Sequence, residues 1–94
     1  NNEPKFVIEN LNIINSKFVG NKHIKSILKA NDGSVLKTFT ANAKDGPLEP
    51  FLNDKYKKKI NIAGKMKLNE WSGKRTIEFI IEDISLSNIN TSSF

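Results

Sequence analysis

Hydrophobic and polar residues alternate along much of this chain, as they do in half-buried β-strands. Residues 23–30 show the alternation most clearly, with Ile24 and Leu28 on one side and His23 and Lys25 on the other. Twelve isoleucines and three valines favour strands further, because β-branched side chains are stiff in helices and pack well on a pleated surface. The pattern therefore predicts a fold built mainly from strands.

A first strand is expected over residues 5–18, but its hydrophobic positions change phase. Phe6 and Ile8 share one parity, whereas Leu11 belongs to the other. A β-bulge near residues 9–10 would repair the alternation, since a bulge inserts one extra residue into a strand. In a small closed barrel, a long and bent first strand can pair with neighbours in both sheets.

The strongest turn signal in the sequence is Asn-Asp-Gly at residues 31–33. A three-residue loop with its glycine in the left-handed conformation would pair Leu28 with Leu36. It would also place Lys37 and Phe39 on the same outer face as the polar residues of the preceding strand. A two-residue loop would reverse the parity and bury Lys37, so packing favours the three-residue loop.

After this third strand, residues 45–56 are expected to form one short amphipathic helix. Asp45 can cap it, and Pro47 and Pro50 are tolerable only in a first turn. Its apolar residues fall at helical spacing and include Leu48, Phe51, Leu52 and Tyr56.

Two more alternating strands are expected over 60–68 and 77–82, joined by a hairpin loop at 69–73 that contains Trp71. The resulting order of three strands, a helix and two strands is that of the OB-fold, a five-stranded Greek-key barrel. The prediction is therefore an all-β protein with small α content. SH3-like and Tudor-like barrels rank below it because they lack a helix of this length at that position.

The length of 94 residues allows a single domain. Residues 1–4 read as a linker, 5–86 as the folded OB domain, and 87–94 as a polar C-terminal tail. Because the chain begins at Asn1 without a methionine, it is expected to be a piece of a larger protein.

Cysteine is absent, which excludes a disulfide framework. Histidine occurs only once, which argues against a metal site built from histidine ligands. No apolar run approaches the length of a membrane span, and no signal-peptide pattern is present. We therefore expect a soluble domain in a reducing compartment, the cytoplasm, with no membrane partner.

The formal net charge of +5 is unevenly distributed. Residues 55–75 carry +7, and the rest of the chain carries −2. A cluster of this kind indicates a polyanionic partner, with nucleic acid ahead of anionic lipid because no basic amphipathic helix accompanies it. An alternative is the codon drift of an AT-rich genome, which would also explain the thirteen asparagines.

Catalysis is not expected from this chain alone. A nuclease needs clustered carboxylates to bind metal ions, but the four aspartates are scattered among turns and element ends. We therefore expect no cofactor here, and whether the protein is an enzyme depends on residues outside the chain.

Binding of single-stranded nucleic acid has better support, since such ligands are held by basic grooves lined with stacking rings. The candidate residues on the second and third strands are Lys22, His23, Lys25, Lys37 and Phe39, and those on the hairpin are Lys65, Lys67, Trp71, Lys74 and Arg75. Trp71 could instead close the barrel as a core residue, and Phe39 has the stronger tendency to be core. The lysine run at 57–59 is the least specific feature, because lysines at the end of a helix also complement its dipole.

Four short segments occur in a fixed order and spacing: GNKHIK at 20–25, NIAG at 61–64, LNEWSGK at 68–74 and IEFIIED at 77–83. Together they resemble the C-terminal OB domain of the bacterial single-stranded-DNA-specific exonuclease RecJ, and Pro47-Leu48 also fits. The resemblance covers roughly residues 5–85. It implies a parent enzyme with upstream DHH and DHHA1 domains that digests single-stranded DNA from the 5′ end, with manganese or magnesium, in DNA repair and recombination.

The resemblance carries a DNA-binding role onto Lys22, His23 and Lys25 by the first motif, and onto Trp71, Gly73 and Lys74 by the hairpin motif. The chain departs from the family at two positions. Ala41 stands where an aromatic residue is frequent, and Glu78 stands where glutamine is frequent. A carboxylate would repel phosphate, so contacts from those two strands are in question.

Two other functions remain open from the sequence. One is a protein-interaction module whose basic surface docks on partner domains, which an exposed apolar patch would favour. The other is an RNA-binding OB domain.

Overall fold

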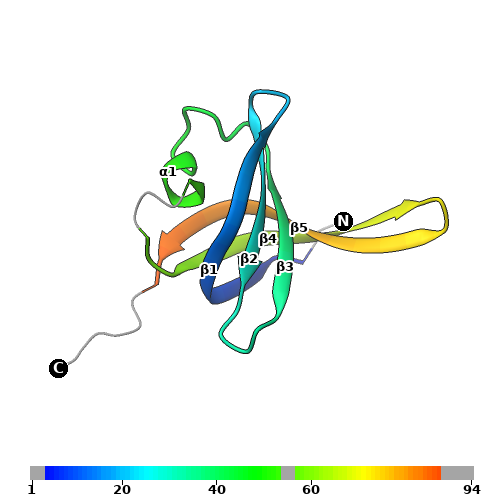
Figure 1. Ribbon diagram of the computed structural model, residues 1–94, viewed down its shortest axis with the longest axis horizontal. Coiled ribbons are helices and arrows are strands. Elements are labelled where there is room, and N and C mark those ends of the chain that lie inside the picture. Colours follow the sequence, from blue (N-terminus) through cyan, green and yellow to red (C-terminus); the bar gives the residue numbers. More distant parts are fainter. Residues whose placement is uncertain (1–3, 54–56, 88–94) are drawn as a thin grey trace.

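The computed structural model describes residues 4–53 and 57–87. Most of the expected linker and tail, and Tyr56 of the expected helix, lie outside the described residues. The elements are β1 (Phe6–Val19), β2 (His23–Lys29), β3 (Val35–Thr40), α1 (Glu49–Leu52), β4 (Ile60–Trp71) and β5 (Lys74–Leu86). The strands close into a barrel in the order β1-β2-β3-β5-β4, in which only β3 and β5 pair in parallel (Figure 1). The predicted five-stranded OB barrel, with its helix between β3 and β4, is confirmed.

A β-bulge lets β1 pair with two different strands. The register with β4 shifts between Ile8 and Leu11, and Asn10 has a φ of 63°. The Asn10 N–H donates to Oδ1 of Asn61 at 3.1 Å, which satisfies a donor that the bulge removes from the ladder. The predicted bulge is confirmed, and a second shift follows between Ile13 and residue 15 in the pairing with β2.

The β2–β3 hairpin has the predicted three-residue loop. The Ala30 N–H donates to the Ser34 carbonyl at 2.8 Å, and Gly33 has a φ of 92°. Leu28 pairs with Leu36, as the loop length requires. This register turns the odd-numbered residues of both strands outward.

The barrel core consists of ten apolar residues under 7% exposed, drawn from β1, β2, β4, β5, the β3–α1 segment and α1. They are Leu11, Ile24, Leu28, Ala43, Leu52, Ile60, Ile62, Phe79, Ile81 and Ile84. Burying each large side chain contributes about 1.5–3 kcal/mol, so the alternation read from the sequence is also the main source of stability. Gly64 lies where β4 and β5 cross most closely, since a Cβ there would sit 1.9 Å from the Ile80 carbonyl oxygen.

The helix is much shorter than the 45–56 segment predicted for it. It spans only Glu49–Leu52, with Leu48 at its N-cap and no side-chain cap. Asp45 is therefore not the cap: it has a φ of 60°, and its own N–H donates to Oε1 of Glu49 at 2.6 Å. The positive φ of Asp45 interrupts the helical conformation, so no helix can run on from Asp45. Leu52 still packs into the core as the pattern predicted.

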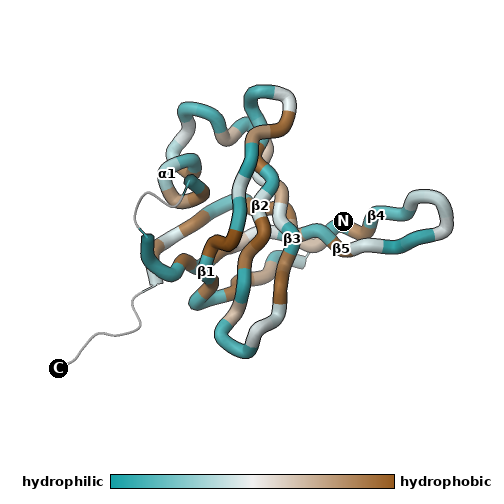
Figure 2. Tube along the Cα trace, viewed as in Figure 1, coloured by the Kyte–Doolittle hydropathy of each residue, from teal (hydrophilic) through white to brown (hydrophobic). Residues whose placement is uncertain are grey.

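The β4–β5 hairpin is longer than predicted, because its turn has only two residues. Ser72 and Gly73 have φ of 52° and 78°, the signs that a type I′ turn requires, and Trp71 pairs with Lys74 beside it. The predicted loop at 69–73 is therefore wrong for its first three residues, which belong to β4. The two strands leave the barrel as a twisted ribbon (Figure 1). Hydrophobic residues are concentrated in the barrel strands, whereas the end of the ribbon is largely hydrophilic to neutral (Figure 2).

Candidate nucleic-acid interface

One row of outward-facing residues crosses the barrel from strand to strand. Lys17 pairs with Lys25, Lys25 with Phe39, Phe39 with Ile80, and Ile80 with Lys65. Three of these five residues, Lys25, Phe39 and Lys65, are candidates predicted from the sequence. The parallel β3–β5 pairing brings them together, because it joins the outer face of β2 and β3 to that of β4 and β5. Lysine charges thus flank an apolar and aromatic centre.

His23 and Phe39 form an aromatic pair on this outer face. Their ring centroids lie 5.3 Å apart with an interplanar angle of 42°. The Asn42 N–H donates to Nδ1 of His23 at 2.9 Å, which leaves the proton on Nε2 as the donor of the neutral ring. Both residues are half-buried, so Phe39 is neither a core residue nor fully exposed.

The ribbon continues the basic outer face beyond the barrel. Lys65, Lys67, Trp71 and Lys74 project from the same face, since Lys74 pairs with Trp71 and the β4 residues are two or four positions apart. Trp71 is 81% exposed, which rules out the alternative that it closes the barrel. The ring is available to stack on a ligand.

Arg75 and Lys22 lie apart from this group. Arg75 projects from the opposite face of the ribbon, where its Nε donates to Oε2 of Glu70 at 2.8 Å. Arg75 thus lies on the hairpin, as predicted, but on the other face from the hairpin lysines. Lys22 lies exposed in the turn between β1 and β2, beyond the end of the strand that carries His23. The last candidate, Lys37, is exposed on the outer face of β3 and pairs with Ile27.

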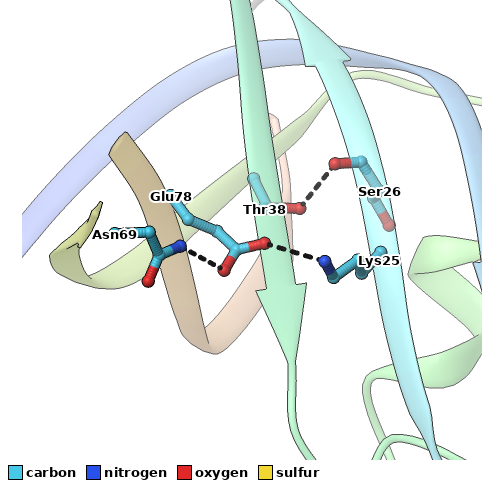
Figure 3. A network of polar contacts seen from close by, with 5 residues as sticks. All are labelled: Lys25, Ser26, Thr38, Asn69 and Glu78. Atoms are coloured by element: carbon cyan, nitrogen blue, oxygen red, sulfur yellow. Dashed lines mark hydrogen bonds and ion pairs between the residues drawn. The ribbon is translucent and has the colours of Figure 1, made fainter. Parts of the chain in front are cut away.

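Glu78 lies on the outer face between Lys25 and Asn69 (Figure 3). Its Oε2 is 3.9 Å from Nζ of Lys25, and its Oε1 accepts a hydrogen bond from Nδ2 of Asn69 at 3.4 Å. The side chain is only 16% exposed and pairs across the ribbon with Lys67. The sequence signalled Glu78 as a departure from the family, but its contact with Lys25 depends on the β3–β5 pairing. This carboxylate neutralises part of the charge that a phosphate would meet.

The opposite face of the ribbon is apolar next to the barrel and carries the Arg75–Glu70 ion pair near its tip. Met66, Leu68 and Ile77 continue the core-facing side of β4 and β5 past the end of the barrel, and they are 43%, 57% and 59% exposed. Phe6 pairs with Gly64 at the base of the ribbon and is 42% exposed. The ribbon therefore has one basic face carrying a tryptophan and a second face that is apolar between the barrel and the Arg75–Glu70 pair.

Two exposed carboxylates are stabilised in their ionised form. Lys5 donates to Oε1 of Glu82 and holds the pKa of Glu82 below its usual range. Hydrogen bonds from the side chain and backbone of Ser34 lower the pKa of Asp32. Among residues 4–53 and 57–87, no group of three or more His, Cys, Asp or Glu side chains could hold a metal ion. The helix in the described part of the chain is too short and too polar to cross a membrane.

Comparisons with known proteins agree with this geometry. The solved structure of the mitochondrial single-stranded DNA binding protein Rim1 from S. cerevisiae is similar over 99% of this chain and 100% of that one, with a TM-score of 0.56. At 14% sequence identity, this likeness concerns the fold. No curated protein sequence matches the chain. The profile of the RecJ OB domain matches residues 1–83, nearly the whole chain, and so the chain belongs to the RecJ OB domain family.

Proposed function

We propose that this domain binds single-stranded DNA along the outer face of the barrel and the basic face of the ribbon. The observation that carries the proposal is the row Lys25–Phe39–Ile80–Lys65, which leads to the exposed Trp71. Lysines on such a surface neutralise phosphates, and exposed rings stack on bases of any sequence. The family membership and the fold shared with a single-stranded DNA binding protein support the same function.

The direct test is a titration of the domain with a short oligodeoxythymidylate while Trp71 fluorescence is recorded. Stacking on the ring should quench the fluorescence, and the affinity should fall as salt rises because bound counterions are released. Lys25→Ala and Lys74→Ala should each weaken binding by a similar factor on every sequence, as phosphate contacts do. If neither quenching nor salt-dependent binding is seen at low ionic strength, the proposal fails. Competition with RNA of the same sequence separates the RNA-binding alternative.

The wider role we propose is delivery of DNA to a RecJ-type exonuclease core. That core would comprise DHH and DHHA1 domains of the same parent chain, use manganese or magnesium, and act in the cytoplasm in DNA repair and recombination. This domain would contribute binding and no catalytic group. Deleting it from the parent enzyme should raise KM for long single strands and leave kcat nearly unchanged. A fall in kcat with KM unchanged would contradict a delivery role.

A second candidate function is docking on a partner protein, and the apolar face of the ribbon favours it. Met66, Leu68 and Ile77 expose a contiguous apolar strip, and such strips mark interaction surfaces. Leu68→Lys should abolish a protein contact on this face and leave DNA binding intact, since Leu68 projects away from Trp71. Unchanged binding to the upstream domains would exclude this face.

A further inference from the structure

The basic segment 55–75 divides into two separate surfaces in the structure. Lys65, Lys67 and Lys74 line the ribbon, whereas the described lysines Lys57, Lys58 and Lys59 precede the opposite end of β4. Eleven residue steps separate Ile60 from Trp71, or about 36 Å at about 3.3 Å per residue. The lysines before β4 therefore cannot act on a nucleotide held at Trp71 and need a separate explanation.

These three lysines line a surface cleft of about 440 Å³ together with Asn12 and Ile13. Nζ of Lys59 donates to Oδ1 of Asn31 in the β2–β3 turn, which fixes this side chain against the barrel. Asn12 pairs with Lys29 at the end of β2, so a fourth lysine lies beside the cleft. We call Lys29, Lys57, Lys58 and Lys59 the distal patch.

The positive charges of the distal patch have fewer carboxylates beside them than those of the outer face. Within residues 4–53 and 57–87, no carboxylate lies within ion-pair distance of its four lysines, whereas Lys25 on the outer face lies 3.9 Å from Glu78. Asp32 lies in the same turn as Asn31, and its charge added to those of the four lysines gives a local net charge of +3. Its carboxylate already accepts the Ser34 N–H at 2.9 Å. An anionic ligand would therefore displace no ion pair between described residues there.

The patch is also continuous with the outer face. Lys29 and Lys25 are four positions apart on β2 and share its outward side, about 13 Å from one another. We call the row Lys25–Phe39–Ile80–Lys65 the central row. A polyanion that leaves the central row at Lys25 would reach Lys29 and then the cleft. Because lysine acts as a point charge, the patch suits backbone phosphates without base discrimination.

We propose that the distal patch is a second phosphate-binding site, which extends the path of single-stranded DNA from the ribbon across the barrel to its far side. The inference rests on the proposed function. It assigns the lysine run a role that only longer strands can use: a short oligonucleotide occupies the ribbon and the central row, and a longer one also engages the patch.

The test compares Lys57→Gln/Lys58→Gln with wild type on oligodeoxythymidylates of about 6 to about 20 nucleotides, a range that overlaps the site sizes of about 4–16 nucleotides found for OB-folds and extends beyond them. Lys59 is kept because of its bond to Asn31. The matched control is Lys5→Gln/Lys44→Gln, which removes two charges outside the row and the patch. Binding is followed by the anisotropy of labelled DNA, and the folded state by Tm.

Each phosphate contact on a single strand adds about 0.7 to the salt exponent, or about fivefold in affinity between 1 M and 0.1 M salt. The double variant should therefore bind long oligonucleotides about 5- to 25-fold more weakly at 0.1 M salt and bind the shortest ones as wild type does. An equal loss at every length, or a loss no larger than that of the control, would overturn the inference and leave the proposed function standing. If wild type binds no length, both fail.

Discussion

Replacement of Glu78 by glutamine should tighten binding to single-stranded DNA. In the unbound domain Glu78 is the counterion of Lys25, at 3.9 Å. A phosphate arriving at Lys25 must compete with this carboxylate. Glutamine keeps an oxygen that can accept the hydrogen bond from Asn69, so the substitution removes the charge and little else.

The size of the effect follows from the geometry. Two unit charges 3.9 Å apart interact by about 1 kcal/mol in bulk water and about 4 kcal/mol at an effective dielectric constant of 20. The Lys25 side chain is 52% exposed, so screening places the pair near the lower value, at about 0.5–1 kcal/mol. Glu78→Gln should therefore tighten binding about two- to fivefold and steepen the salt dependence by up to about 0.7.

Fluorescence anisotropy at three or more salt concentrations measures both quantities. Glu70→Gln is the matched control, because it removes the same charge from the opposite face of the ribbon, where Glu70 pairs with Arg75 at 2.8 Å. An affinity that stays the same or falls in Glu78→Gln would refute the competition. So would an equal gain in Glu70→Gln, since net charge alone would then explain the result.

Three further outcomes follow from the structure. Gly64→Ala would bring a Cβ to 1.9 Å from the Ile80 carbonyl oxygen and should destabilise the barrel by at least about 3 kcal/mol in chemical denaturation. The control Gly20→Ala, at a φ of 65° and with no atom near the new Cβ, should cost only about 1–2 kcal/mol. Equal costs for the two variants would contradict the close approach at Gly64. Trp71→Ala should weaken DNA binding by about 1–3 kcal/mol and leave Tm within a degree or two, since the ring is 81% exposed; a large fall in Tm would show that it packs. Because the pKa of Asp32 is lowered in the folded state, its contribution to stability is present at neutral pH and is lost as pH falls through that lowered value. Asp32→Asn should therefore lose less stability than wild type between pH 7 and pH 3 in urea unfolding, and an identical loss would contradict this.

The barrel itself could be predicted from the sequence where a buried face imposed alternation. The pairing of Leu28 with Leu36 followed from a three-residue loop, since a two-residue loop would have buried Lys37. The bulge at Asn10 followed from a change of phase in the apolar residues of β1. In both cases the core determined the register, so a pattern of apolar positions carried the information.

The ribbon was mispredicted because no core lies beneath its outer half. Met66, Leu68 and Ile77 alternate correctly, but the polar residues from Asn69 onward resembled a loop, and the short turn at Ser72 was not recognised. The helix was overestimated for a related reason: apolar spacing was visible in the sequence, whereas the positive φ of Asp45 was not.

The sequence predicted part of the spatial grouping of the candidate residues. The parity of β2 and β3 placed Lys25 and Phe39 on one face, as the structure has them. The contact between Lys25 and Glu78 joins strands more than fifty residues apart through the parallel β3–β5 pairing, which local patterns do not encode. The separation of Arg75 from the hairpin lysines depends on the two-residue turn, which was not anticipated.

The length of the ribbon can change only by an even number of residues in each strand if Trp71 is to stay on the basic face. Removing two residues from each strand beyond Gly64 would bring Trp71 about 7 Å closer to the barrel and keep it among the lysines. Removing one residue from each would move it to the face of Leu68 and Ile77, since successive side chains alternate. The reach of the tryptophan is therefore adjustable in even steps, without any change to the barrel that supports it.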